Sequence, residues 1–198
     1  MKKLSALLLV LLLTASCVET VVVGSLATIV VVTREKTLES TKDDVIIAAK
    51  IDKEFLESGL KSPRNSVSVM VNEGRVLLTG IVRDADKGRT AIVVPWKIFG
   101  VKEVIDEIEI SDQNVKVVDY GGDFRDSFIT SLIKSKLFFN QKIIPANYKI
   151  LTFRKVVYVF GVAREDTDIK EVLRIISKTS GVKKVVNHVI LANDSRRK

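Results

Sequence analysis

The sequence predicts an α+β protein made of two tandem units, each with the element order helix, strand, strand, helix, strand. The first observation is a motif that occurs twice, 81 residues apart: Gly80-Ile81-Val82-Arg83-Asp84 returns as Gly161-Val162-Ala163-Arg164-Glu165. The second is a shorter repeat at the same spacing: Gly100-Val101-Lys102-Glu103-Val104 returns as Gly181-Val182-Lys183-Lys184-Val185. A spacing that is kept through several elements indicates duplication of one folding unit. The two copies can therefore be compared residue by residue.

The first unit opens with an amphipathic segment over residues 43–55. Its apolar residues recur every four positions and fall on one side of a helix, namely Ile47, Ile51 and Phe55. Apolar residues then alternate over 67–71 and again over 76–80, with Asn72-Glu73-Gly74 between them. Alternation interrupted by a short glycine-containing turn predicts a β-hairpin.

The second part of the unit supplies a helix and a third strand. Residues 84–98 read as the helix, although Pro95 makes its last turn doubtful. Gly100 is placed for a left-handed stop, and 101–110 alternate again as a strand. A helix that joins two strands makes a right-handed crossover, so we expect a three-stranded mixed sheet with both helices on one face.

The second unit repeats these elements in the same order. We expect helices at 125–139 and 166–178 and strands at 148–153, 155–162 and 182–191. The predicted domains span 43–111 and 123–192, separated by a linker at 112–122 and followed by a basic tail at 193–198.

The N-terminus is predicted to be a lipoprotein signal peptide, residues 1–16. Lys2 and Lys3 precede a short apolar run and then small residues before Cys17, the only cysteine of the chain. A disulfide within the chain is therefore impossible. We expect Cys17 to be acylated, with 17–42 acting as anchor and spacer. The alternative is an uncleaved anchor in which residues 4–32 cross the membrane together.

Charge is distributed unevenly between the units. Residues 44–110 carry 10 basic and 11 acidic side chains, a net charge of −1, whereas residues 125–198 carry 16 basic and 6 acidic side chains, a net charge of +10. Such asymmetry predicts an anionic partner for the second half. Export argues against nucleic acid, and anionic membrane lipid is favoured.

The layout resembles the BON domain, a small αββαβ module of bacterial envelope proteins. The residues that carry the resemblance are 76–82 and 100–108 with their counterparts in the second copy. A signal with Cys17 followed by two such domains is similar to the dual BON-domain outer-membrane lipoproteins. The resemblance implies a periplasmic, non-enzymatic protein on the outer membrane. It also implies binding of anionic phospholipid through the second domain, which supports envelope integrity.

The first helix of the second unit carries apolar residues that its core stripe does not require. These are Phe124, Phe128, Leu132 and Phe139, and the first-copy counterparts of the last three are Ile46, Lys50 and Glu57. Basic residues lie along the same segment, namely Arg125, Lys134, Lys136 and Lys142. An apolar face with a basic fringe is typical of a helix at the headgroup boundary of a membrane. We predict that Phe124, Arg125, Phe128, Leu132, Lys134, Lys136 and Phe139 bind phospholipid, and the resemblance places the family's lipid contacts around Phe128.

Two other uses of this face stay open. Phe124, Phe128 and Leu132 would also fit packing against the first domain, or contact with an envelope assembly protein. The sequence holds no nucleophile–base pair, phosphate loop or metal-ligand spacing, so no catalytic residue, metal site or cofactor is expected. His188, the only histidine, aligns with Glu107 and is predicted to lie on an exposed face.

Overall fold

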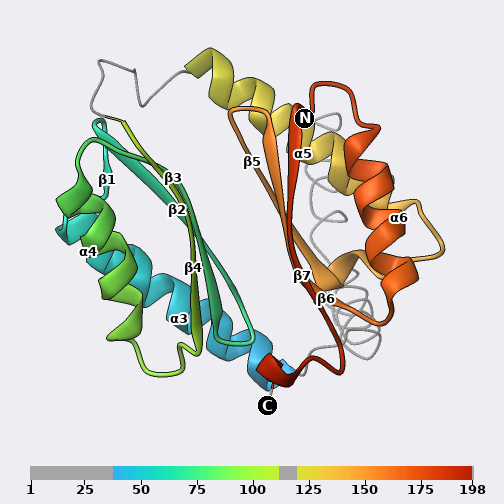
Figure 1. The fold of residues 1–198 in the computed structure, drawn as a ribbon, viewed down its shortest axis with the longest axis horizontal. Coiled ribbons are helices and arrows are strands. Elements are labelled where there is room, and N and C mark those ends of the chain that lie inside the picture. The colour runs from blue at the N-terminus through green and yellow to red at the C-terminus, as the bar shows by residue number, and fades with distance from the viewer. Residues whose placement is uncertain (1–37, 112–119, 198) are drawn as a thin grey trace, which may run out of the picture. The chain divides into compact units, whose positions relative to one another are not determined.

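The computed structural model describes residues 38–111 and 120–197 (Figure 1). The predicted signal peptide, Cys17 and the alternative membrane-crossing anchor lie outside these ranges. Within them, no helix combines the length and the apolar character needed to cross a membrane.

The first domain contains two helices and one sheet. Its elements are α3 (Leu38–Glu57), β1 (Lys61–Ser62), β2 (Asn65–Asn72), β3 (Arg75–Val82), α4 (Ala85–Trp96) and β4 (Glu103–Ile110). The strand order is β1-β2-β3-β4, with β3 antiparallel to β2 and parallel to β4. Figure 1 shows α3 and α4 on the same face of this sheet, as the crossover rule predicts.

The first sheet has four strands rather than the three that we predicted. The extra strand, β1, is a two-residue edge strand that pairs with the start of β2. The Ser62 hydroxyl accepts a hydrogen bond from the Asn65 amide at 3.2 Å and closes the turn between the two strands. The second copy is one residue shorter here and forms a 3₁₀ turn instead, so it lacks the equivalent of β1.

The second domain has the predicted three-stranded sheet. Its elements are α5 (Tyr120–Phe138), η1 (Pro145–Asn147), β5 (Tyr148–Phe153), β6 (Val156–Ala163), α6 (Asp166–Ser177), β7 (Lys184–Leu191) and η2 (Ser195–Arg197). β6 lies centrally, antiparallel to β5 and parallel to β7. Helix α5 begins inside the segment predicted as linker, so the Gly121-Gly122 pair continues as helix. Intrinsic propensity is a weak guide where tertiary packing extends a helix.

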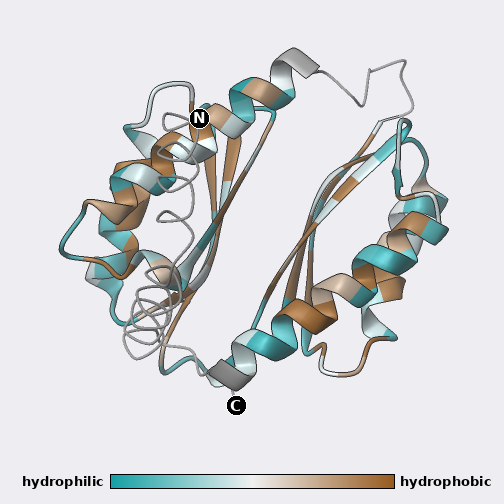
Figure 2. Cartoon of the chain, turned by 180° about the vertical axis from the view of Figure 1, so that it is seen from behind, coloured by the Kyte–Doolittle hydropathy of each residue, from teal (hydrophilic) through white to brown (hydrophobic). Residues whose placement is uncertain are grey.

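Each domain has its own core between helices and sheet. The predicted stripe of Ile47, Ile51 and Phe55 is buried in the first core, and its counterparts Ile129, Ile133 and Leu137 are buried in the second. Hydropathy along the chain follows this pattern, with apolar strands and helices that alternate between polar and apolar positions (Figure 2). Burial of each such side chain stabilises the fold by roughly 1.5–3 kcal/mol.

In both copies a buried aspartate of the first helix accepts hydrogen bonds from the hairpin turn. In the first domain the Asp44 carboxylate accepts hydrogen bonds from the amides of Glu73, at 2.8 Å, and Gly74, at 2.9 Å. In the second, Asp126 accepts hydrogen bonds from the turn amides of Arg154 and Lys155. These aspartates therefore explain why an acid recurs on a core-facing side of the helix.

The repeated glycine in β3 and β6 allows a close approach of two backbones. Gly80 has φ +125°, and a Cβ placed there would lie 2.0 Å from the carbonyl oxygen of Ser66. Gly161 makes the same approach to Asn147. Only glycine tolerates this geometry without displacement of the neighbouring strand.

The faces of the two sheets that the helices leave uncovered contact each other. Leu77, Tyr158 and Phe160 form a third buried cluster, and partly buried side chains from both sheets pack around it. Consecutive residues of β3 point to opposite faces, so Leu77 contacts this cluster while Val76 and Leu78 enter the first core. The eight residues of β3 are consequently all buried.

His188 lies at this contact, so our prediction of an exposed face for it was wrong. Its side chain is only 19% exposed, and its Nε2 lies 2.9 Å from Oε1 of Glu107. The two residues are equivalent positions of the repeat. One pair of equivalent positions therefore meets at the contact between the sheets.

Candidate functional site

Helix α5 carries the apolar side chains that the sequence singled out, and most of them face solvent. Phe124 is 74% exposed, Phe128 is 63% exposed and Phe139, just after the helix, is 78% exposed. Leu132 is half-buried. At about 100° per residue these positions lie to one side of the buried Ile129, Ile133 and Leu137. The fold does not need them for its core.

The structure adds Phe138 to this group, which sequence reasoning missed. Phe138 is 71% exposed, and its ring packs edge-to-face with that of Phe139 at a centroid distance of 5.4 Å. Its first-copy counterpart, Leu56, is also apolar and exposed, so comparison of the copies gave no contrast. The position of Phe138 on the helix, away from the core stripe, was the available signal. We call the surface formed by Phe124, Phe128, Leu132, Phe138 and Phe139 the aromatic stripe.

Basic side chains flank the aromatic stripe on both sides. Arg125, Lys134 and Lys136 are all exposed, and the helical spacing places Lys134 on one flank and the other two on the opposite flank. The Lys136 ammonium donates a hydrogen bond to the Thr179 hydroxyl at 3.1 Å, which directs it toward the end of α6. The stripe on α5 is therefore bordered by exposed cations on both sides.

The equivalent surface of the first domain is more polar. Ile46, the counterpart of Phe128, is 48% exposed, whereas Lys50 and Glu57 occupy the places of Leu132 and Phe139. Because the same fold forms with charged residues at those places, the aromatic rings are a property of the second copy alone.

The two domains meet through their sheets rather than through α5. The buried contact cluster draws its members from β2 to β7, and Phe124 and Phe128 take no part in it. The alternative that these rings pack against the first domain is therefore not what the structure shows. Their exposure leaves the stripe available to another molecule.

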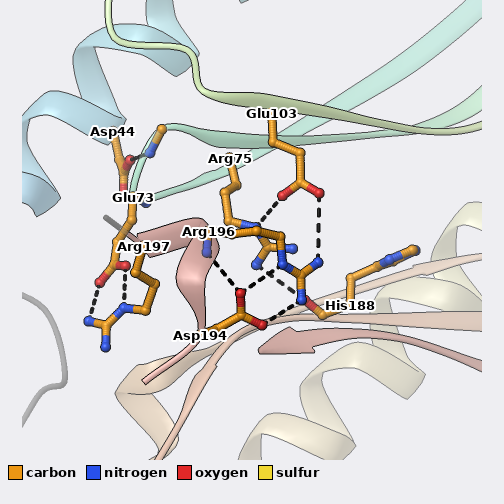
Figure 3. Close-up of polar contacts among 9 residues, drawn as sticks. Asp44, Glu73, Arg75, Glu103, His188, Asp194, Arg196 and Arg197 are labelled. Carbon is orange, nitrogen blue, oxygen red and sulfur yellow. Dashed lines mark hydrogen bonds and ion pairs between the residues drawn. The ribbon is translucent and has the colours of Figure 1, made fainter. Parts of the chain in front are cut away.

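Part of the basic surplus of the second half is matched by acids of the first domain (Figure 3). Arg197 binds both carboxylate oxygens of Glu73, at 2.7 and 2.8 Å. Arg154 donates to Glu109 at 2.9 Å, and Arg196 lies 3.8 Å from Glu103. In each pair the first domain supplies the acid and the second supplies the base, as it also does between Glu107 and His188. From the sequence we predicted that the basic surplus serves an external anionic partner. The structure corrects this prediction, because part of the surplus pairs with acids of the first domain.

Arg75 is the most deeply buried cation of the contact. It is 1% exposed, binds Glu103 of its own domain and reaches the carbonyl oxygen of His188 at 3.4 Å. Its guanidinium lies 5.0 Å from the ring centroid of Phe160. A buried guanidinium needs such paired acceptors and an aromatic face to offset its desolvation.

Several carboxyl and phenol groups of the second domain have shifted pKa values. Hydrogen bonds from Arg174 and then from Asn140 lower the pKa of Glu171 to about 2. Hydrogen bonds from Arg196 hold the pKa of Asp194 below its ordinary value. Burial, followed by the charges of Glu107 and Glu109, raises the pKa of the Tyr158 phenol. The two carboxyl shifts therefore report hydrogen bonding to arginines, and the phenol shift reports burial at the contact between the sheets.

A cleft also lies in a different place from the aromatic stripe. It has a volume of about 680 Å³ and is lined by the start of α3, the loop after α4 and the C-terminal segment. Phe99, at its edge, is 97% exposed. Within residues 38–111 and 120–197, no cluster of three or more His, Cys, Asp or Glu side chains could hold a metal ion.

The comparisons with known proteins identify the fold family. A sequence profile of the BON domain matches residues 43–112 and 125–193. These two matches cover more than half of the chain, so the chain belongs to the BON-domain family, with two copies of the domain.

Three relatives illustrate this membership. An uncharacterized protein from the gshII 5′ region of Anaplasma centrale is 36% identical over 79% of this chain and 99% of its own length. The outer membrane lipoprotein DolP of Haemophilus influenzae is 27% identical over 94% of both chains. The osmotically-inducible protein Y of Escherichia coli is 28% identical over 73% of this chain and 71% of its own.

Proposed function

We propose that this BON-domain protein is a lipid-anchored protein of the periplasmic face of the outer membrane. In this proposal its second domain binds anionic phospholipid through the aromatic stripe, and this binding supports outer-membrane integrity. The observation that carries the proposal is the exposure of Phe124, Phe128, Phe138 and Phe139 on one surface of α5. Acyl chains on Cys17 would tether the chain, and the segment to residue 42 would act as a spacer.

The chemistry of the stripe suits the boundary between lipid headgroups and acyl chains. Transfer of an exposed ring such as Phe128 into the apolar layer contributes roughly 1.5–3 kcal/mol. Each cation near an anionic surface, such as Lys134, adds about 1 kcal/mol. An apolar surface with a basic rim thus gains from both terms only at a membrane that carries negative charge.

The relatives support the location. DolP is named as an outer membrane lipoprotein, and its similarity to this chain extends over nearly the whole length of both. The predicted lipoprotein signal agrees with this location. No catalytic role is part of the proposal.

A second candidate function is that of an adaptor for an envelope assembly or pore complex. An exposed apolar patch on the first domain favours it. Val93, Trp96 and Phe99 are all more than half exposed, and their second-copy counterparts are Arg174, Ser177 and Ser180. An exposed apolar patch that the fold does not require is typical of a protein contact.

Vesicle sedimentation tests the proposal. Residues 34–198 form a compact unit, so this fragment can be tested without Cys17 and the apolar N-terminal segment. We expect its binding to rise with the phosphatidylglycerol content of phosphatidylcholine vesicles and to fall with salt. Phe128→Glu should weaken binding at least about tenfold, because the ring is lost and a like charge faces the membrane.

The first domain supplies the matched control. Ile46→Glu places the same charge at the equivalent, exposed position of α3 and should leave vesicle binding unchanged. If Phe128→Glu binds vesicles as the wild type does, the lipid proposal is wrong. Should Val93→Glu instead abolish contact with an envelope complex while vesicle binding persists, the adaptor function would replace it.

A further inference from the structure

A hollow of about 440 Å³ lies beside the aromatic stripe, between the C-terminal ends of α5 and α6. Phe139, at one edge, is shared with the stripe. Three cations contribute to its lining, one from α5, one from α6 and one that follows α6: Lys136, Arg174 and Lys178. Ser135 adds a hydroxyl group. We call this place the cationic hollow.

The cations retain donors that the fold does not use. Arg174 gives Nε and Nη2 to Glu171, at 2.7 and 2.8 Å, which leaves the hydrogens of Nη1 for another acceptor. Lys136 donates one hydrogen bond, to Thr179. Lys178 is exposed and has no ion pair among the described residues. With Glu171 counted against Arg174, the hollow keeps a net charge of about +2.

The first copy shows that the fold does not require these charges. Glu54 and Val93 stand where the second copy has Lys136 and Arg174, and only Lys97 keeps the charge of Lys178. Cations near a helix C-terminus also stabilise the helix dipole. However, α3 and α4 end without any basic residue in their last turn, so dipole compensation is not needed in this fold.

We propose that the cationic hollow binds the phosphate group of an anionic phospholipid headgroup while the aromatic stripe lies in the apolar layer. This inference rests on the proposed function and specifies which part of the lipid the second domain recognises. Phosphate oxygens accept charge-assisted hydrogen bonds from guanidinium and ammonium groups. Phe139 fits the junction, because it borders both the hollow and the stripe.

The test compares two pairs of charge deletions in the 34–198 fragment. Arg174→Ser with Lys178→Ser removes two cations of the hollow. Arg89→Ser with Lys97→Ser removes an arginine and a lysine from the equivalent helix region of the first domain, where both are exposed. Binding is measured on phosphatidylcholine vesicles with a rising fraction of phosphatidylglycerol.

The hollow variant should lose roughly 25-fold in affinity for the anionic vesicles, about fivefold per cation. The control variant should lose less than about twofold, because its charges lie outside the second domain. Equal losses in both variants would show that the vesicles sense only overall charge, and no loss in the hollow variant would show that the hollow is empty of lipid. Either result overturns the proposal.

Two further experiments are needed. The first distinguishes a lipid headgroup from a soluble phosphate, and the second distinguishes failure of this proposal from failure of the proposed function. Glycerol phosphate or inorganic phosphate should compete with anionic vesicles for the wild type and not for the hollow variant. If inorganic phosphate binds at the hollow but vesicle affinity does not depend on Arg174 and Lys178, the site serves a soluble ligand and the headgroup assignment is wrong. Phe128→Glu, in contrast, should lose binding to neutral vesicles as well, which the hollow variant should retain.

Discussion

The two domains of this chain share one scaffold but differ in the surfaces that the scaffold exposes. The core stripe of the first helix, the buried aspartate and the close-approach glycine occur in both copies. The aromatic stripe and the cationic hollow occur only in the second, and the patch of Val93, Trp96 and Phe99 occurs only in the first. Residues common to both copies therefore serve folding, whereas residues that differ identify the surfaces with separate uses.

The contact between the domains shows the same division. Equivalent sheet faces meet, yet the side chains at their rim have opposite signs, with acids from the first copy and bases from the second. Like charges in these pairs would repel each other across the contact. The two copies therefore present complementary charges to each other at this contact.

The largest effect is expected from the aspartates that both copies share. Asp44→Ala and Asp126→Ala should each lower the free energy of unfolding by about 3 kcal/mol, because two turn amides lose a charged acceptor. Urea denaturation of each variant measures this loss. A loss in only one variant would contradict the view that the hydrogen bonds from the hairpin turn to this aspartate belong to the common scaffold.

A smaller effect is expected from charge exchange across the domain contact. Glu73→Arg, which copies Arg154 of the second domain, should cost about 2 kcal/mol because it faces Arg197. Combined with Arg197→Glu, the exchanged pair should recover at least half of that loss. A double-mutant cycle in urea measures the coupling, and additive losses would show that the two side chains do not interact.

The smallest effect concerns alkaline pH. Because the pKa of the Tyr158 phenol is raised in the folded state, the folded protein binds this proton more tightly than the unfolded chain does. The stabilisation is fully present below about pH 10, the unfolded value, and is lost as pH rises through the folded pKa. Ultraviolet titration of tyrosinate should show one late phenol that Tyr158→Phe removes. A Tyr158→Phe protein with an unchanged titration would exclude this assignment.

Much of the fold was predictable because its signals are local. The period of Ile47, Ile51 and Phe55 defined a helix face, and Asn72-Glu73-Gly74 defined a hairpin whose central residues have positive φ. The extra strand β1 was not predictable, because a single hydroxyl from Ser62 closes its turn. The start of α5 was also missed, since a glycine pair favours a loop unless packing extends the helix.

The candidate site was predictable in part. Comparison of the copies found Phe124, Phe128 and Phe139, since each is a ring that the core does not use. It missed Phe138, whose counterpart is also apolar and so gave no contrast. It also missed Arg174 and Lys178, because they lie on or just after α6, 35 and 39 positions along the chain from Phe139, the stripe residue that lines the same hollow.

The amino-acid sequence by itself determined the duplication, the order of elements and the side of each helix that enters a core. These features depend on spacings within a few residues, and side-chain direction follows backbone period. Only the tertiary structure decided that the open sheet faces contact each other, that Glu73 meets Arg197 and that His188 meets Glu107. Those partners lie 124 and 81 residues apart in the chain. The local sequence around a charged side chain does not specify which opposite charge the fold will bring within reach of it.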